Sequence, residues 1–178
     1  MRSVAIDDLS VLISAAEIES KVEELAREIS DHYRHDLPIF VGVLNGSTMF
    51  LADLVRAIPE SVRIEYMAVS SYGDAMTSSG TVRILKDLDT DIAGQQVLIV
   101  EDIVDTGTTV DHLIRMLGER DPSEIRVASL LRKPLAREAG TKADWVGFDI
   151  EDLFVVGYGL DHAGSYRNLP YVAVFQPD

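Results

Sequence analysis

The sequence lacks several features, and each absence narrows the class of protein. It contains no cysteine, so disulfide bonds and thiolate chemistry are excluded. No apolar run approaches the roughly 20 residues that a membrane-spanning helix needs. Residues 1–10 mix charged and apolar side chains and lack the apolar core of a secretory signal. We therefore expect a cytoplasmic protein without a membrane partner.

Basic residues are also scarce. The chain has 16 lysines and arginines against 30 aspartates and glutamates, which gives a formal net charge of −14. Such a charge repels phosphate backbones, so we expect no nucleic-acid partner. If the substrate is a small anion, metal ions and locally placed basic groups must reverse the sign of the potential at the site.

The chain of 178 residues, 47% of them hydrophobic, suits one globular domain. Apolar residues recur at helical spacing in three segments, and short apolar runs predict strands between them. The predicted helices are 14–33, about 48–58 and about 109–117, and the predicted strands are 38–44, 62–70, 82–85, 96–101, 125–131, 145–148, 154–156 and 171–175. This alternation predicts an α/β domain with a central, mainly parallel sheet flanked by helices.

Ligands of parallel sheets lie beyond the carboxyl ends of the strands, so the loops after Leu44 and Val100 are the candidate site. In the second loop, a strand is predicted to end on two adjacent carboxylates, Glu101 and Asp102. The turn that follows reads Asp105-Thr106-Gly107-Thr108-Thr109.

A tight turn at Gly107 would let threonine hydroxyls and the first helical amides surround a phosphate. The carboxylates can bind ribose hydroxyls or hold a hard cation. Each residue alone could be a solvated strand end or a helix cap. A helix cap, however, requires neither an acid pair nor a third acid at the loop entrance, so the whole run indicates a ligand site.

This segment resembles the phosphoribosyl-pyrophosphate signature of type I phosphoribosyltransferases. The whole chain, over about Val41–Val174, is similar to the bacterial hypoxanthine–guanine phosphoribosyltransferases. Five motifs occur in the order of that family: Leu44-Asn-Gly-Ser47, Ser70-Ser-Tyr-Gly73, the signature itself, Leu131-Arg-Lys-Pro134, and Phe154-Val-Val-Gly-Tyr-Gly-Leu-Asp161 with Tyr166-Arg167.

The resemblance implies one domain over residues 1–178 with the type I phosphoribosyltransferase fold. The core would cover about 10–148, and a small hood would comprise about 149–178 with the N-terminal residues. The implied reaction transfers the 5-phosphoribosyl group of phosphoribosyl pyrophosphate to N9 of hypoxanthine or guanine, giving IMP or GMP and pyrophosphate in a reversible step of purine salvage. Two Mg²⁺ ions and a homodimer or homotetramer are also implied.

The resemblance assigns the sugar-phosphate residues position by position. Asp105 matches the acid that exchanges a proton at purine N7. Glu101 and Asp102 would face the ribose hydroxyls and a magnesium ion, Glu101 through water. The 5′-phosphate would be held by Asp105, Thr106, Gly107, Thr108 and Thr109.

For the base, Lys133 would donate to the purine 6-oxo group, and because an ammonium has only donors it would refuse adenine. Phe154 would stack on the base and Val155 would offer its backbone. Asp161 would contribute to the purine site and bind the second magnesium ion, while Arg167 would bind pyrophosphate.

In the first loop, Leu44-Asn45 matches a nonproline cis peptide of the family. The amides of Asn45, Gly46 and Ser47 would bind pyrophosphate, although the family commonly has a basic residue where this chain has Asn45. Ser71 and Tyr72 would belong to a mobile loop that closes over the reaction and excludes water.

Three alternatives remain at this level. One is a xanthine-preferring enzyme of the same fold. Another is an RNA-binding regulator on that fold, which the acidic composition disfavours. The third is a noncatalytic α/β nucleotide-binding module, which leaves the joint match of Asp105, Lys133, Asp161 and Arg167 unexplained.

Overall fold

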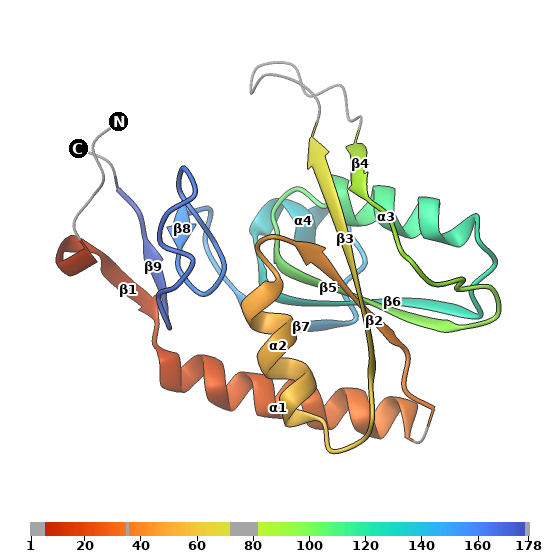
Figure 1. Ribbon diagram of the computed structural model, residues 1–178. Helices are drawn as coiled ribbons and strands as arrows, with labels where there is room; N and C mark the ends of the chain where they lie inside the picture. The colour runs from red at the N-terminus through yellow and green to blue at the C-terminus, as the bar shows by residue number, and fades with distance from the viewer. Residues whose placement is uncertain (1–5, 35, 72–81, 177–178) are drawn as a thin grey trace.

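The part of the chain that the structure describes forms two sheets and four α-helices (Figure 1). The computed structural model describes residues 6–34, 36–71 and 82–176. The larger sheet has six strands in the order β4 (Val82–Lys86), β3 (Arg63–Ser71), β2 (Ile39–Leu44), β5 (Gln96–Val104), β6 (Glu124–Arg132) and β7 (Trp145–Asp149). Only β4 runs antiparallel to its neighbour, so the predicted mainly parallel sheet is confirmed.

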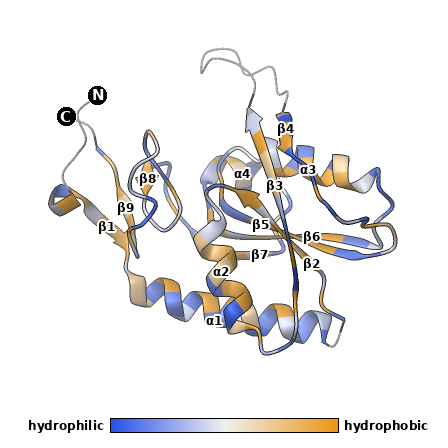
Figure 2. Cartoon of the chain, in the orientation of Figure 1, coloured by the Kyte–Doolittle hydropathy of each residue, from blue (hydrophilic) through white to orange (hydrophobic). Residues whose placement is uncertain are grey.

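Helices cover both faces of this sheet. Apolar residues of α1 (Ala15–Tyr33) and α2 (Thr48–Ala57) pack on one face. On the other face lie α3 (Thr108–Gly118) and the short α4 (Pro134–Ala139). The central strands are apolar along most of their length (Figure 2), as expected for strands buried on both faces. Among residues 6–34, 36–71 and 82–176, no helix is both long and apolar enough to cross a membrane.

A smaller antiparallel sheet lies beside the first, and we call it the hood sheet. It consists of β1 (Ser10–Ile13), β9 (Val172–Val174) and β8 (Val155–Val156), preceded by a short 3₁₀ turn at Ile6–Asp8. Strand β1, near the N-terminus, therefore pairs with β9, near the C-terminus, and the two strands lie side by side (Figure 1).

The structure differs from the sequence prediction at several boundaries. Strand β5 continues to Val104, so Glu101 and Asp102 lie within the strand and not at its end. Helix α3 begins at Thr108 after Gly107, and Gly118 is its last residue. Strand β1 and helix α4 were not predicted, because both are short and β1 has an almost fully exposed pattern.

Helix α1 begins where its sequence predicts. Ser14 is the N-cap residue, and its backbone amide and its hydroxyl both donate to a carboxylate oxygen of Glu17, at 2.8 and 2.6 Å. The Glu17 amide in turn donates to the Ser14 hydroxyl at 3.3 Å. This reciprocal capping box satisfies amides that the first turn would otherwise leave without partners.

We predict that Ser14→Ala lowers the free energy of unfolding by about 1 kcal/mol, the usual cost of losing an N-cap. The hydrogen bonds from Ser14 hold the pKa of Glu17 below its usual value. Because that pKa is lower in the folded state, this part of the stabilisation exists above the unfolded pKa and is lost as pH falls. The gap between wild type and Ser14→Ala in urea unfolding should therefore narrow in acid, whereas Ser20→Ala, on an exposed part of α1, should show no such gap.

Candidate functional site

Two carboxylates lie near the carboxyl end of the central strand β5. Successive side chains of a strand point to opposite faces, so Glu101 and Asp102 leave the strand in different directions. Glu101 is only 5% exposed. Burial, and secondarily the charge of Asp102, raise the pKa of Glu101 well above its usual value. Only Asp102 is directed toward the first loop.

Asp102 packs directly against that loop. A Cβ placed on Gly46 would lie 1.5 Å from Oδ2 of Asp102, so only glycine fits there. Burial raises the pKa of Asp102 to about 6, although the backbone amides of Ile103 and of Asp102 itself, together with the charge of Arg167, act in the opposite direction. The nearby Asp161 raises it further. A bound cation would stabilise the ionised form of Asp102.

The first loop joins β2 to α2 and contains the expected cis peptide between Leu44 and Asn45. Ser47 is fully buried, and its hydroxyl donates to the Val43 carbonyl at 2.8 Å. The Ser47 amide also lies within hydrogen-bonding reach of that carbonyl, at 3.4 Å. Ser47 therefore shapes the loop from inside, and the loop backbone leads straight into α2.

The turn after β5 is open to solvent. Asp105 and Thr106 are exposed, and the hydroxyls of Thr106 and Thr108 lie 3.0 Å apart. Gly107 has a φ of +87°, and a Cβ there would lie 1.9 Å from the Thr141 hydroxyl. The turn thus needs glycine for its backbone conformation and for its close packing on Thr141. Thr109 follows in the first turn of α3, where free amides favour an anion.

Lys133 reaches this turn from the end of β6. Its Nζ donates to Oδ2 of Asp105 and to Oδ1 of Asp152, both at 3.1 Å. Its side chain is 11% exposed. Burial alone would lower the pKa of Lys133, but hydrogen bonds to the two carboxylates raise it above its usual value. The structure thus brings Asp105 and Lys133 together and keeps the lysine charged.

A cluster of three aromatic rings lies in the hood. Phe154 is 53% exposed, and its ring meets those of His162 and Phe175 edge-on, each at 5.7 Å between centroids. His162 in turn stacks on Phe175 at 4.3 Å. Phe154 is therefore packed against these two rings and leaves about half of its own surface exposed. Val155 is buried in β8 and can offer only backbone groups.

Arg167 and Asp161 form an ion pair in the hood. The Arg167 Nη2 lies 2.7 Å from Oδ1 of Asp161, and its Nη1 donates to the Gly159 carbonyl at 2.6 Å. Oδ2 of Asp161 accepts from the Gly164 amide at 2.7 Å. Both carboxylate oxygens of Asp161 therefore have partners. Arg167 also lies close enough to Asp102 for its charge to act against the rise in the pKa of that carboxyl.

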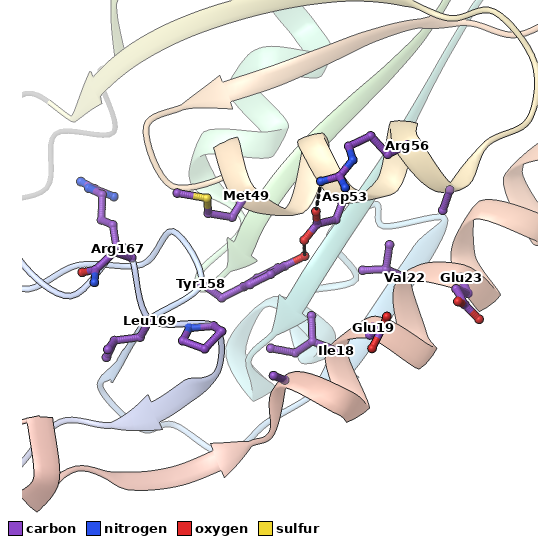
Figure 3. Close-up of a pocket in the computed structure, with 14 residues that line it drawn as sticks. Ile18, Glu19, Val22, Glu23, Met49, Asp53, Arg56, Tyr158, Arg167 and Leu169 are labelled. Carbon is purple, nitrogen blue, oxygen red and sulfur yellow. Dashed lines mark hydrogen bonds and ion pairs between the residues drawn. The ribbon is translucent and has the colours of Figure 1, made fainter.

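A pocket of about 520 Å³ lies between α1, α2 and the segment Arg167–Pro170 (Figure 3). Of the site residues predicted from the sequence, only Arg167 lines it. The pocket thus adjoins the candidate site at Arg167, and neither Lys133 nor the turn at Asp105 lines it. Tyr72 of the predicted closing loop lies outside the described residues, and Ser71 is the last residue of β3.

Four residues near the site were missed by sequence reasoning. Asp152 could have been suspected, because it lies two residues before Phe154 in an acidic pair. Tyr158 lies inside the motif Phe154–Asp161, but its bond to Asp53 depends on a distant part of the chain. Thr141 and Phe175 carried no sequence signal, since their places also depend on distant contacts. Across residues 6–34, 36–71 and 82–176, no three acids or histidines gather as a preformed metal cage.

A parallel sheet with an open threonine-rich turn and paired carboxylates near the carboxyl ends of its strands is typical of proteins that bind a phosphate-bearing ligand. The family model described as phosphoribosyl transferase domain matches residues 13–163. The chain therefore belongs to the phosphoribosyltransferase family, as its motifs indicated.

Comparison with individual proteins shows which members of this family the chain resembles. The chain is 48% identical to the hypoxanthine-guanine phosphoribosyltransferase of Bacillus subtilis over 167 residues, which cover 94% of this chain and 93% of that protein. It is 51% identical to the enzyme of the same name from Mycobacterium avium, with 96% and 87% covered. A crystal structure of a hypoxanthine phosphoribosyltransferase from Staphylococcus aureus matches with a TM-score of 0.92 at 41% identity, covering 99% of this chain and 97% of that one. The expected resemblance to this group is confirmed.

We predict that Gly46→Ala destabilises the protein by about 1–3 kcal/mol, the usual cost of overpacking, because the new Cβ collides with Asp102. Gly118→Ala is the matched control, since a Cβ there meets nothing within 4 Å. In an Asp102→Ala background the penalty at Gly46 should shrink, which a double-mutant cycle in denaturant measures. An unchanged penalty would show that the carboxylate is not the obstacle.

Proposed function

We propose that this enzyme transfers the 5-phosphoribosyl group from phosphoribosyl pyrophosphate to N9 of hypoxanthine or guanine, releasing pyrophosphate. The observation that carries the proposal is the ion pair between Lys133 and Asp105 at the entrance of the exposed turn before α3. It places a cationic donor and a carboxylate side by side, next to a backbone that suits a phosphate.

The base lies, in this proposal, between Lys133 and the ring of Phe154. Lys133 donates to the 6-oxo group, which hypoxanthine and guanine share and adenine lacks. Asp105 takes up or returns the N7 proton as the glycosidic bond forms or breaks. Asp152 keeps Lys133 in place while Asp105 turns to the base, because it holds the same Nζ at 3.1 Å.

The sugar phosphate occupies the turn 105–109 in the same proposal. Its 5′-phosphate accepts hydrogen bonds from the free amides at the start of α3 and from the threonine hydroxyls. Pyrophosphate lies toward the loop Asn45–Ser47 and Arg167, whose guanidinium supplies positive charge in an acidic protein. Asn45 contributes no charge there, so Arg167 carries more of that task.

Mg²⁺ fits the carboxylates of this site. Magnesium in phosphate sites uses one or two protein carboxylates together with substrate oxygens and water, so a preformed cage is not required. In this proposal Asp102 would hold one ion, with Glu101 acting through water, and Asp161 would hold a second ion. When bound, the metal neutralises charge on the departing pyrophosphate. The raised pKa of Asp102 supports this choice, since the charge of Arg167 offsets only part of the effect of burial and a bound cation would favour the ionised carboxylate further.

A preference for xanthine is the nearest alternative, and the acidic composition weighs against an RNA-binding role. Assembly as a homodimer or homotetramer and a cytoplasmic location are part of the same proposal. Sedimentation at several concentrations would test the assembly.

Incubation with phosphoribosyl pyrophosphate and Mg²⁺ and each of hypoxanthine, guanine, xanthine and adenine tests the activity. IMP and GMP should accumulate, adenine should give no nucleotide, and EDTA should stop the reaction. Faster product from xanthine than from hypoxanthine would favour the alternative enzyme, and no product from any base would refute the proposal.

Replacing the proposed proton-transfer group should mainly affect turnover. We predict that Asp105→Asn lowers kcat by roughly 10²–10⁴, as expected for loss of an acid–base group. Asp152→Asn is the matched control, because it alters the other carboxylate partner of Lys133 without removing the N7 contact. If both variants lose the same factor, the effect of Asp105 reflects its ion pair with Lys133 and not proton transfer.

A further inference from the structure

Tyr158 connects the hood to helix α2. It follows β8 in the turn between Gly157 and Gly159, has a φ of +49°, and is only 6% exposed. Its hydroxyl donates to Oδ2 of Asp53 on α2 at 2.8 Å. Figure 3 shows the side chain extending from the hood segment to Asp53, where Arg56 also pairs with the carboxylate.

Gly159, the residue after Tyr158, packs against the first loop, which joins β2 to α2. Gly159 has a φ of +97°, and a Cβ there would lie 2.0 Å from the carbonyl oxygen of Gly46. The Gly159 carbonyl accepts from Arg167, and its amide donates to the Arg167 carbonyl at 3.0 Å. Gly159 is thus the point where the hood, through Arg167, meets the first loop.

The anchor of Tyr158 lies on the helix that begins directly after this loop. Asp53 is on α2, whose first residue is Thr48. Because a helix is stiff over ten residues, fixing the turn to Asp53 also fixes it relative to Asn45–Ser47. Burial, and then the hydrogen bond and charge of Asp53, raise the pKa of Tyr158, so the hydroxyl remains a donor near neutral pH.

We propose that Tyr158 is a positioning residue for the pyrophosphate end of the site. Its hydrogen bond to Asp53 holds Gly159 on the Gly46 carbonyl and thereby sets Arg167 against Asp102. Its hydroxyl is bound by α2, whereas Lys133 and Phe154 form the proposed base end. The inference rests on the proposed function, because it assigns this contact to the binding of one proposed substrate, phosphoribosyl pyrophosphate.

Tyr158→Phe should raise the KM for phosphoribosyl pyrophosphate, and for pyrophosphate in the reverse reaction, on the order of tenfold, the expected effect of losing a hydrogen bond to a charged group. The KM for hypoxanthine should change less than about twofold on the same reasoning, because the base end keeps its contacts. Tyr171→Phe, a half-buried hood tyrosine outside this contact, is the control and should match wild type.

Variants of Asp53 separate positioning from general stability. Asp53→Asn keeps an oxygen acceptor for the Tyr158 hydroxyl and should stay near wild type. Asp53→Ala should reproduce the shift of Tyr158→Phe, and the double variant should add nothing further. These variants also test the inference should Tyr158→Phe fold poorly.

Equal changes in KM for the base and for phosphoribosyl pyrophosphate, or no change in either, would overturn the role of Tyr158. This failure differs from failure of the proposed function. In the first case the wild-type enzyme forms IMP or GMP, and in the second it forms neither.

Discussion

The site depends on close contact of three backbone segments around Gly46. The carboxylate of Asp102 packs against Gly46, and Gly159 of the hood packs against the Gly46 carbonyl oxygen. Neither glycine has space for a methyl group. Residues from the first loop, the central strand and the hood are therefore held in one arrangement. Interiors are packed at crystal-like density, so such contacts transmit position with little slack. The proposed pyrophosphate end thus rests on backbone packing and only secondarily on long side chains.

Basic side chains of the candidate site are paired with acids within an acidic chain. The chain carries a net charge of −14, yet Lys133 and Arg167 are each held beside carboxylates in the candidate site. These acids hold the two cations in place before a substrate arrives. An anionic substrate would then compete with the acids for both cations, and metal bound at Asp102 would lower that competition. The acidic composition and an anionic substrate are thus compatible through local pairing.

The hood supplies the two parts of the site that the large sheet does not. Phe154 rests on His162 and Phe175 and keeps one face open, and Arg167 is tied to Gly159 by two hydrogen bonds. Strand β1 completes the hood sheet from the N-terminal side. We therefore propose that the base and the pyrophosphate bind where the edge of the large sheet meets the hood. Small-molecule sites commonly lie at such junctions between structural units.

The sequence by itself determined the elements with strong local patterns and the motif that carries the chemistry. The capping box at Ser14, the buried strands and the turn at Gly107 could be predicted because helix and strand periods and glycine requirements are local properties. Sequence periodicity could not reveal β1, whose pairing with β9 is supplied by the other end of the chain. Only the tertiary structure placed Asp152 beside Lys133 and Tyr158 beside Asp53, a contact between residues 105 positions apart. Such contacts depend on how whole elements pack, and no local pattern encodes that.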